Sequence, residues 1–261
     1  MTEVLLLLSR IAEADSTKAV WDLASGWFRT LGFSRANYGF TRFRSPRNVG
    51  DPDDALFLTT ADPDYVQRYF RGNFYARTPV FRWAERNQGA CTWAWVRRAL
   101  EAGELTPDEA DTVRQNAAWG IVAGISVSFP DTSTRAKGAL GLLADPGITQ
   151  DRVEEIFATR GPELLAVAHM MHLRVIQLPI ASRRRALTAR QRESLEWVAD
   201  GKTSADVAML MGVSSAMVEK HLRLARESLS VDTTAQAVAK AALLNLIFQP
   251  VVPSQASVAA G

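Results

Sequence analysis

The chain has 261 residues, of which 47% are hydrophobic, and a formal net charge of +2 at pH 7. This length and apolar share fit one large domain or two ordinary domains with buried cores. Its single cysteine, Cys91, excludes an internal disulfide framework, and no apolar run is long enough to span a bilayer, so we expect a cytoplasmic protein without a membrane partner.

The first 175 residues predict helices and strands in mixed order. The apolar stripe within 21–31 is typical of an amphipathic helix, and a further helix carries Tyr65 and Tyr69. Apolar runs bounded by turn residues predict strands at 36–44, 55–59, 121–129 and 138–144. The order favours an α+β fold in which residues 1–175 form an α/β/α sandwich with a central antiparallel sheet.

Local signals also define the second half of this region. Thr106-Pro107-Asp108-Glu109 combines a capping box with proline at the first helical position, so a helix is expected to begin there. A long helix is predicted over 149–177, and Gly161-Pro162 within it predicts a kink or a break. The expected later segments are a linker at 176–186, a helical domain at 187–248 and a disordered tail at 249–261.

Residues 187–246 contain four short amphipathic patterns in tandem, and three of them follow a capping box. In a capping box one side chain accepts from an exposed helix N–H, and the side chain three residues on reaches back to the first backbone N–H. The pairs are Thr188 with Gln191, Thr203 with Asp206, and Thr233 with Gln236. Only Met211-Gly212-Val213-Ser214 separates the second and third patterns, which predicts a tight corner with Gly212 in the left-handed conformation. This segment therefore predicts a four-helix domain containing a helix–turn–helix, which offers a helix to the DNA major groove.

The third pattern has one apolar face and one basic face. Its apolar stripe consists of Val218, Leu222, Ala225 and Leu229. Ala216, Lys220 and Arg223 project away from that stripe, and Glu219 and Arg226 lie on its flank. Basic side chains there can neutralise phosphates and donate to guanine, and Glu219 can accept from cytosine. The same face would suit the solvated surface of an ordinary helical bundle, but the tandem context favours DNA.

Several motifs in this region are similar to one known signature. They are Leu187-Thr188-x-Arg190-x-x-Glu193, Trp197-x-Ala199-x-Gly201-Lys202-Thr203, Val207-Ala208, Val213-Ser214, Val218 with His221, and Ala237-Val238-Ala239-x-Ala241. On these residues the chain resembles the LuxR family of transcriptional regulators. The resemblance implies that 215–229 reads the major groove, that 234–246 helps to form a homodimer, and that a double-stranded DNA operator and RNA polymerase are partners. The implied DNA-binding residues are Thr203, Ser214, Ser215, Ala216, Glu219, Lys220, Arg223 and Arg226.

Three positions depart from the family pattern. Met217 stands where the family usually has Thr, Ser228 where Lys is common, and Thr234 where Arg is frequent. Each change loses a polar or phosphate-reaching side chain, and losing phosphate contacts lowers affinity for any DNA sequence. One alternative function is therefore an antiactivator that sequesters a related regulator in inactive heterodimers.

The first domain is similar, along 60–144, to the autoinducer-binding members of the same family, which enclose an acyl-homoserine lactone. The positions that correspond to the family's ligand-binding Trp, Tyr, Asp, Pro, Trp and Gly are Tyr65, Tyr69, Thr78, Pro79, Trp93 and Gly124. Val80 and Gly141 complete the expected ligand-binding set. The resemblance implies that Tyr65 donates to the lactone carbonyl, Tyr69 bonds the acyl carbonyl and Trp93 stacks under the lactone ring, while Gly124 keeps the wall open.

Two departures change the polar groups of this expected site. Tyr65 offers a phenol where the family has an indole, and Thr78 offers a hydroxyl where an ionised Asp accepts from the ligand's amide N–H. Without charge assistance the second bond is weaker by on the order of 1 kcal/mol. Because a pocket's few polar groups set its specificity, the ligand is expected to be altered. A second alternative is therefore an orphan receptor with a non-lactone ligand or none.

Other chemistries have weaker signals. His169 and His172 can share a helix face, but no Cys or carboxylate cluster completes a metal site. Cys91 has no His partner for nucleophilic catalysis, and there is no Gly-rich phosphate loop. The acidic residues of 51–54 lie in a Gly- and Pro-rich loop, which disfavours a phosphorylated receiver domain. We predict no catalytic residue, no metal and no cofactor other than the small-molecule ligand.

Overall fold

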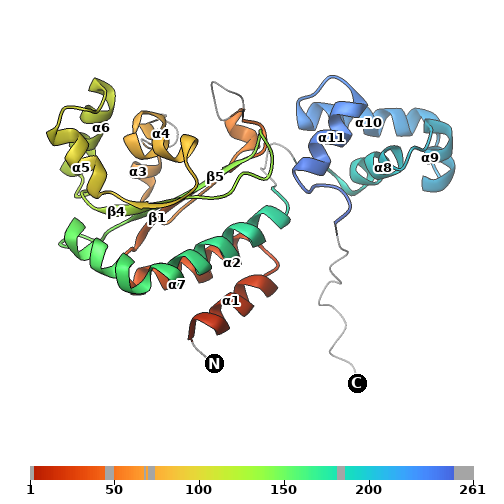
Figure 1. Ribbon diagram of the computed structural model, residues 1–261. Coiled ribbons are helices and arrows are strands. Elements are labelled where there is room, and N and C mark those ends of the chain that lie inside the picture. The colour runs from red at the N-terminus through yellow and green to blue at the C-terminus, as the bar shows by residue number, and fades with distance from the viewer. Residues whose placement is uncertain (1–2, 45–49, 68, 70–73, 181–185, 250–261) are drawn as a thin grey trace. The chain divides into compact units, whose positions relative to one another are not determined.

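The computed structural model describes residues 3–44, 50–67, 69, 74–180 and 186–249 (Figure 1). The chain divides into two units, Met1–Leu178 and Pro179–Gly261, each with its own buried side chains. Residues 181–185 of the linker expected at 176–186, and the tail expected at 249–261 from its second residue on, lie outside the described residues.

The first unit is built on a five-stranded antiparallel sheet with the order β2-β1-β5-β4-β3. The strands are β1 Arg35–Thr41, β2 Leu56–Thr59, β3 Gly89–Thr92, β4 Gly124–Ser128 and β5 Lys137–Leu143. Four of them fall within or next to the ranges expected from the sequence. The fifth, β3, was not predicted, because its sequence Gly-Ala-Cys-Thr is too short and too mixed to show strand periodicity.

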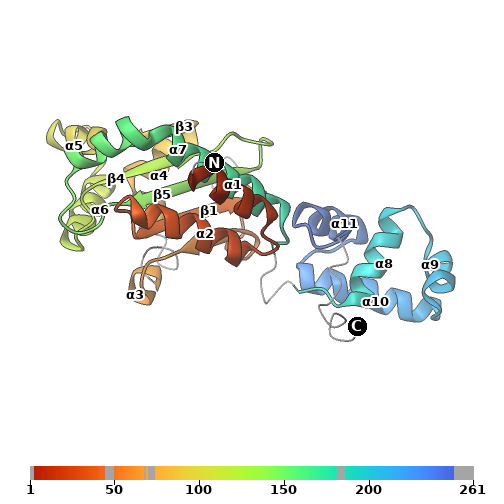
Figure 2. The ribbon, with the colours of Figure 1, turned by 90° about the horizontal axis from the view of Figure 1, so that it is seen from below.

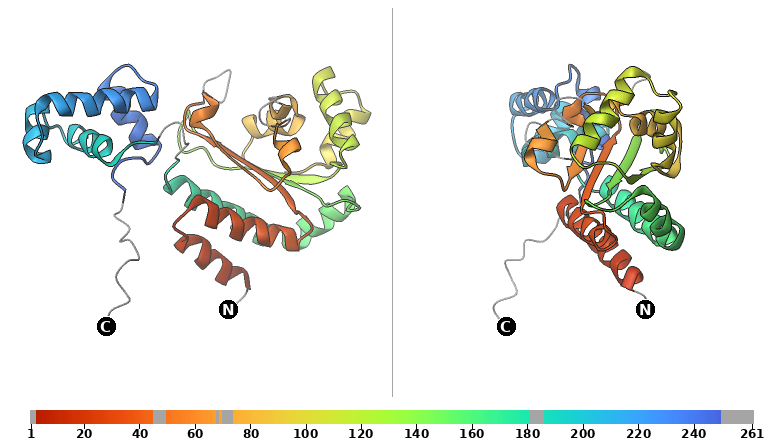
Figure 3. Two further views of the ribbon diagram at one scale, coloured as in Figure 1. Left: turned by 180° about the vertical axis from the view of Figure 1, so that it is seen from behind. Right: turned by 90° about the vertical axis from the view of Figure 1, so that its left-hand side faces the viewer.

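Helices cover both faces of this sheet, which confirms the predicted α/β/α sandwich (Figure 2). One layer contains α1 Glu3–Glu13, α2 Thr17–Thr30 and α7 Gln150–Gln177, and α1 packs against both other helices. The other layer contains α3 Pro63–Val66, α4 Pro79–Arg86, α5 Ala94–Glu101 and α6 Pro107–Ala118 (Figure 3). The described residues of this unit also include the short 3₁₀ turns Pro52–Asp54 and Phe74–Arg77.

A kink or a break was expected at Gly161-Pro162, and the break does not occur, because helix α7 runs through Pro162 without interruption. Proline removes one helical hydrogen bond, but packing can override that loss. Gly161, Leu164 and Val167 are all buried in this part of the helix. The tertiary packing of these buried residues holds the helix together where the local sequence alone predicts a stop.

Strand β1 shows how the two faces differ. Alternate residues of a strand point to opposite faces. Tyr38 contacts Trp21 of α2 and His172 of α7, so it faces the α1–α2–α7 layer. Asn37 and Gly39 consequently face the α3–α6 layer, where they line a cavity.

The second unit is a bundle of four helices, as predicted: α8 Ala189–Ala199, α9 Ser204–Met211, α10 Ser215–Leu229 and α11 Thr234–Leu243. All three expected capping boxes are present, at the starts of α8, α9 and α11. Gly212 ends α9 with φ 64° and ψ 37°, which confirms the left-handed corner. The stripe of Val218, Leu222, Ala225 and Leu229 is buried, so the opposite face of α10 is the exposed one. Within the described residues, no helix combines the length and apolar character needed to cross a bilayer.

Candidate functional site

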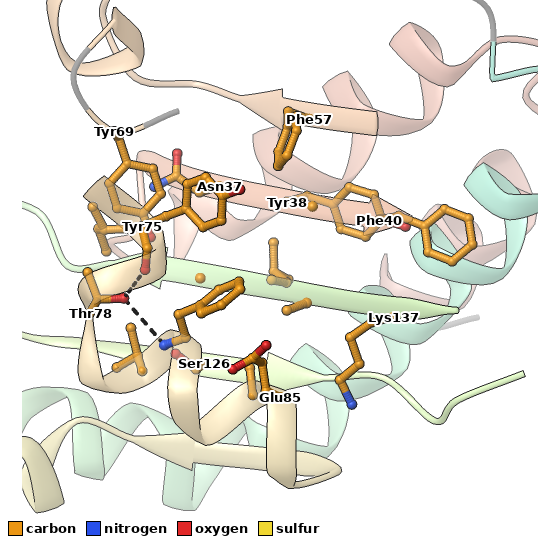
Figure 4. Close-up of a pocket in the computed structure, with 18 of the residues that line it drawn as sticks. Asn37, Tyr38, Phe40, Phe57, Tyr69, Tyr75, Thr78, Glu85, Ser126 and Lys137 are labelled. Carbon is orange, nitrogen blue, oxygen red and sulfur yellow. Dashed lines mark hydrogen bonds between the residues drawn. The ribbon is translucent and has the colours of Figure 1, made fainter. Parts of the chain in front are cut away.

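A cavity of about 130 Å³ lies between the sheet and the α3–α6 layer (Figure 4). Its lining is mainly aromatic and apolar, with a few polar side chains. Tyr69, Asn37 and Thr78 lie at one end in Figure 4, and Glu85 and Lys137 lie at the other. A second cavity of about 370 Å³ adjoins the first. The residues that line both cavities are Thr78, Val80, Trp93, Asn116 and Ile121.

Tyr65 and Tyr69 form one wall of the first cavity. Asp62 caps α3 by accepting from the backbone N–H of Tyr65 at 2.9 Å, and Pro63 occupies the first helical turn. The two tyrosine rings stack with centroids 5.0 Å apart and planes 16° apart. Burial raises the pKa of both hydroxyls, that of Tyr69 to about 12, so both phenols are neutral donors at pH 7.

The hydroxyl of Tyr65 belongs to a polar chain that crosses three elements. Asn37 Nδ2 donates to the Tyr65 oxygen at 3.1 Å, and the Thr59 hydroxyl donates to Asn37 Oδ1 at 2.7 Å. Asn37 and Thr59 are direct partners in the β1–β2 register. Sequence reasoning missed Asn37, because its place beside Tyr65 depends on strand pairing and on where α3 docks.

Thr78 is 2% exposed and is the N-cap of α4. Its hydroxyl donates to the Tyr75 carbonyl at 2.8 Å and accepts from the Phe81 N–H at 3.3 Å, as Figure 4 shows. A hydrogen bond with Tyr69 engages the same hydroxyl. The sequence interpretation made this oxygen a ligand acceptor, but in the fold most of its hydrogen-bonding capacity serves the protein itself.

Trp93 lines both cavities and is held by β4. Its indole Nε1 donates to Ser126 Oγ at 3.0 Å, and its backbone N–H donates to the Gly124 carbonyl at 3.0 Å. Ser126 is 5% exposed and lines the first cavity, although the sequence did not single it out. The available signal was the alternation of β4, which puts Ser126 two residues from Gly124 on the same face.

Gly124 lines neither cavity, contrary to its expected place in the pocket wall. A Cβ atom there would lie 2.4 Å from the Leu142 carbonyl oxygen and 3.0 Å from the Trp93 ring. Glycine is therefore required for close packing of the Trp93 ring on the sheet. Its contribution to the site is to seat Trp93, not to form open space.

The remaining expected ligand-binding residues divide between the cavities. Val80 lines both, and Gly141 lines the first cavity. Pro79 lines only the second, because it occupies the first turn of α4 next to the Thr78 cap. Sequence reasoning missed other aromatic residues of the first cavity, which come from β2, the 3₁₀ turn and α4: Phe57, Tyr75 and Phe81.

Charged side chains lie at the other end of the first cavity. Lys137 is 9% exposed, forms an ion pair with Asp131 at 3.0 Å and donates to the Asn87 carbonyl at 3.3 Å. Glu85 of α4 is exposed and lines the cavity beside it. The cavity is therefore hydrogen-bonding at the Tyr65 end, apolar along its length and charged at the Lys137 end.

In the second unit, the side chains expected to contact DNA lie along α10. Ser215, Ala216, Glu219, Lys220 and Arg223 are exposed. Glu219 accepts from the Ser204 hydroxyl at 2.6 Å, and Arg223 pairs with Glu227 at 2.5 Å. Lys220 forms no ion pair with any residue that the structure describes. This surface is compatible with the major groove because small residues lie at its start and basic residues follow.

The other three expected DNA-binding residues have contacts within the bundle. Ser214 Oγ accepts from the Met217 N–H and caps α10. Thr203 caps α9, and its hydroxyl donates to Asp206 at 2.7 Å, which lowers the pKa of that carboxyl. Arg226 donates to the Thr234 hydroxyl at 2.9 Å and is half-buried between α10 and α11. These three side chains position α9, α10 and α11, whatever contacts they make with DNA.

The residues considered for metal or nucleophilic chemistry lie within the first unit. His172 is 3% exposed and stacks on Phe129 with ring centroids 4.1 Å apart. His169 meets the edge of the same Phe129 ring. Burial raises the pKa of the Cys91 thiol to about 11, so it is protonated at pH 7. Among the described residues, no group of three or more His, Cys, Asp or Glu side chains has the arrangement to hold a metal ion.

Comparison with known proteins finds a matching protein family for each of the two units. A family model for the autoinducer binding domain matches residues 16–175, and the model for bacterial regulatory proteins of the luxR family matches 185–241. The transcriptional activator SolR of Ralstonia nicotianae is 29% identical over 225 residues, which cover 84% of this chain and 88% of SolR. The quorum sensing-dependent regulator RpaR of Rhodopseudomonas palustris is 29% identical over 222 residues, covering 81% of this chain and 84% of RpaR.

Solved structures share the fold. Escherichia coli SdiA aligns with a TM-score of 0.51 and 20% identity over 94% of this chain and 98% of the SdiA chain. CepR2 of Burkholderia cenocepacia, described as an N-acylhomoserine lactone-dependent factor, aligns with a TM-score of 0.50 and 15% identity over 66% of this chain and 95% of its own. The chain belongs to the LuxR family of quorum-sensing transcriptional regulators, with an autoinducer-binding domain followed by a LuxR-type helix–turn–helix.

Proposed function

We propose that the first cavity binds an N-acyl homoserine lactone and that this binding controls DNA recognition by α10 in a homodimer. The observation that carries the proposal is the convergence of Tyr65, Tyr69 and Trp93 on one apolar cavity from separate elements. Pockets with an aromatic wall and a few placed polar groups are typical of small-molecule sites. CepR2, an N-acylhomoserine lactone-dependent factor that shares this fold, supports the ligand class.

In this proposal the lactone ring lies against Trp93, and the acyl chain extends along the apolar wall. Tyr65 and Tyr69 are neutral phenols, so they can donate to carbonyl oxygens without a change of protonation. The acyl chain contacts the rings of Phe57, Tyr75 and Phe81. Burial of each CH₂ against such a wall contributes about 0.8 kcal/mol.

The coupling to DNA is a linkage effect. A ligand that binds only the folded, dimer-competent state shifts the population toward that state. A homodimer would then present two copies of α10 to half-sites about 34 Å apart, one turn of the duplex. The exposed Lys220 and Arg223 are the side chains we expect to contact DNA phosphates and bases.

The direct test is the thermal midpoint of the purified protein against the concentration of N-acyl homoserine lactones of increasing chain length. We expect a saturable rise with one range of chain lengths, which Trp93→Ala abolishes. Trp95→Ala is the matched control, because Trp95 is two residues away and lines neither cavity. A folded protein whose midpoint is unchanged by every lactone would contradict the proposal and favour the orphan alternative.

A further inference from the structure

The side chain of Asn116 contains an unpaired acceptor at the junction of the two cavities. Asn116 lies in the last turn of α6 and lines both cavities together with Thr78 and Trp93. Its Oδ1 is buried, and it forms no hydrogen bond with any residue that the structure describes. Buried carbonyl oxygens are nearly always hydrogen-bonded, and an exception inside a cavity is a place for a ligand's donor.

The backbone of Asn116 is firmly held, so this oxygen has a defined position. Its main-chain carbonyl accepts from the N–H groups of Trp119 and Ile121, at 3.0 and 2.9 Å. Those bonds close the end of α6 and start the turn that leads into β4. The unpaired side-chain oxygen is therefore attached to an ordered corner of the cavity wall.

Thr78, the residue at the family's acceptor position, has little capacity left. Its proton goes to the Tyr75 carbonyl, its oxygen accepts from the Phe81 N–H, and Tyr69 is hydrogen-bonded to the same hydroxyl. A further partner on that oxygen would compete with the cap of α4. Asn116 lines the same cavity, and its Oδ1 has no hydrogen-bond partner among the described residues.

Two hydroxyl groups of the first cavity complement this acceptor. The Tyr65 oxygen accepts from Asn37, and Ser126 Oγ accepts from Trp93, which leaves the proton of each hydroxyl available to an acceptor on a ligand. Tyr65 and Ser126 therefore offer two O–H donors, and Asn116 offers one carbonyl acceptor. A ligand with one amide N–H and two carbonyl oxygens uses all three.

We propose that Asn116 Oδ1 accepts the amide N–H of the ligand, while Tyr65 and Ser126 donate to its carbonyl oxygens. The inference rests on the proposed function and extends it, because it names α6 as the source of the N–H acceptor. The acceptor is an uncharged amide, so ligand affinity does not depend on ionisation of a carboxylate at this position. Asn116 is consequently a specificity-determining residue for amides over esters.

The test compares each variant's affinity for an N-acyl homoserine lactone with that for the ester analogue in which oxygen replaces the amide N–H. Affinities come from the concentration dependence of the thermal midpoint, each variant being compared with its own ligand-free midpoint. We expect wild type to prefer the amide by about tenfold, which equals about 1.4 kcal/mol. Asn116→Leu should bind both compounds alike, and Asn116→Asp should strengthen the preference because its acceptor is charged.

The matched control is Gln115→Leu, which removes a neighbouring amide on the same helix that bonds Asp111 and lines neither cavity. It should keep the wild-type preference. If Asn116→Leu does not fold, Asn116→Asp alone tests the inference. An amide preference equal to that of wild type in Asn116→Asp overturns it. A full amide preference in folded Asn116→Leu also overturns it, and leaves the proposed function intact. No midpoint shift of wild type with any lactone overturns both.

Discussion

The hydroxyl of Tyr38 and Nδ1 of His172 lie 2.8 Å apart, at the contact between β1 and α7. Burial, together with the nearby His169 and Arg42, lowers the pKa of His172 to about 4. The imidazole is therefore neutral in the folded protein at pH 7. Burial also raises the pKa of the Tyr38 hydroxyl far above its ordinary value, so this pair is a neutral hydrogen bond inside an aromatic cluster.

This pair predicts a loss of stability in mild acid. An unfolded His titrates near pH 6.5, whereas His172 in the folded protein titrates near pH 4. Its contribution is fully present above about pH 6.5 and is lost as the pH falls toward 4, because the unfolded state then binds the extra proton. The loss should reach about 3 kcal/mol. Urea unfolding at several pH values should show it, with a flatter profile for His172→Gln. Equal pH profiles for the two proteins would rule out His172 as the source.

The two glycines of the site should respond differently to a side chain. At Gly141 a Cβ atom would meet nothing closer than 3.9 Å, and the position faces the first cavity. Gly141→Val should therefore fold, with a thermal midpoint close to wild type, but it should weaken lactone binding at least tenfold by filling the cavity. Ligand titration of the folded variant measures this. Unchanged affinity would show that the ligand lies elsewhere.

Gly124→Ala should instead destabilise the protein. The added methyl group would lie 2.4 Å from the backbone oxygen of Leu142, so the sheet or the Trp93 ring must shift. Such overpacking costs about 1–3 kcal/mol. Chemical denaturation gives the difference directly. A variant as stable as wild type would mean that β4 and β5 can move apart to accommodate the methyl group at little cost in free energy.

On the helix–turn–helix, Lys220→Ala and Arg223→Ala should each weaken binding to a mixed-sequence duplex of about 30 base pairs and reduce the salt slope by about 1. Lys18→Ala removes the same charge from an exposed site in the first unit and is the control. Fluorescence anisotropy at several salt concentrations measures the slopes. Absence of any DNA binding by the homodimer would favour the antiactivator alternative.

Thr203 gives a test of stability on the same unit. Its side chain caps α9 and bonds Asp206, so Thr203→Ala should cost about 1 kcal/mol of unfolding free energy. Thr203→Ser keeps the hydroxyl and should restore most of that loss. Thermal unfolding of both variants measures these differences. Equal thermal midpoints for Thr203→Ala and wild type would show that the cap does not stabilise the unit.

The helix–turn–helix unit could be predicted from sequence almost completely. Its capping pairs are three residues apart, its corner depends on Gly212 alone, and its core stripe follows helical periodicity. All of these interactions join residues that are close in the chain, so local chemistry determines them. The centres of the other four strands in the first unit could also be predicted, because they too depend on local sequence patterns. The short β3 had too few residues to show such a pattern.

The ligand site depended on the tertiary structure. The family resemblance of the sequence predicted Tyr65, Tyr69 and Trp93 as ligand-site residues, and all three line the first cavity. It also assigned Thr78 to the ligand, but the fold makes that hydroxyl a helix cap. It did not reveal Ser126 or Asn116, whose places beside the cavity come from β-sheet register and from the packing of α6. These contacts join residues far apart in the chain. Which polar atoms are left without a partner is therefore decided only when every element is in place.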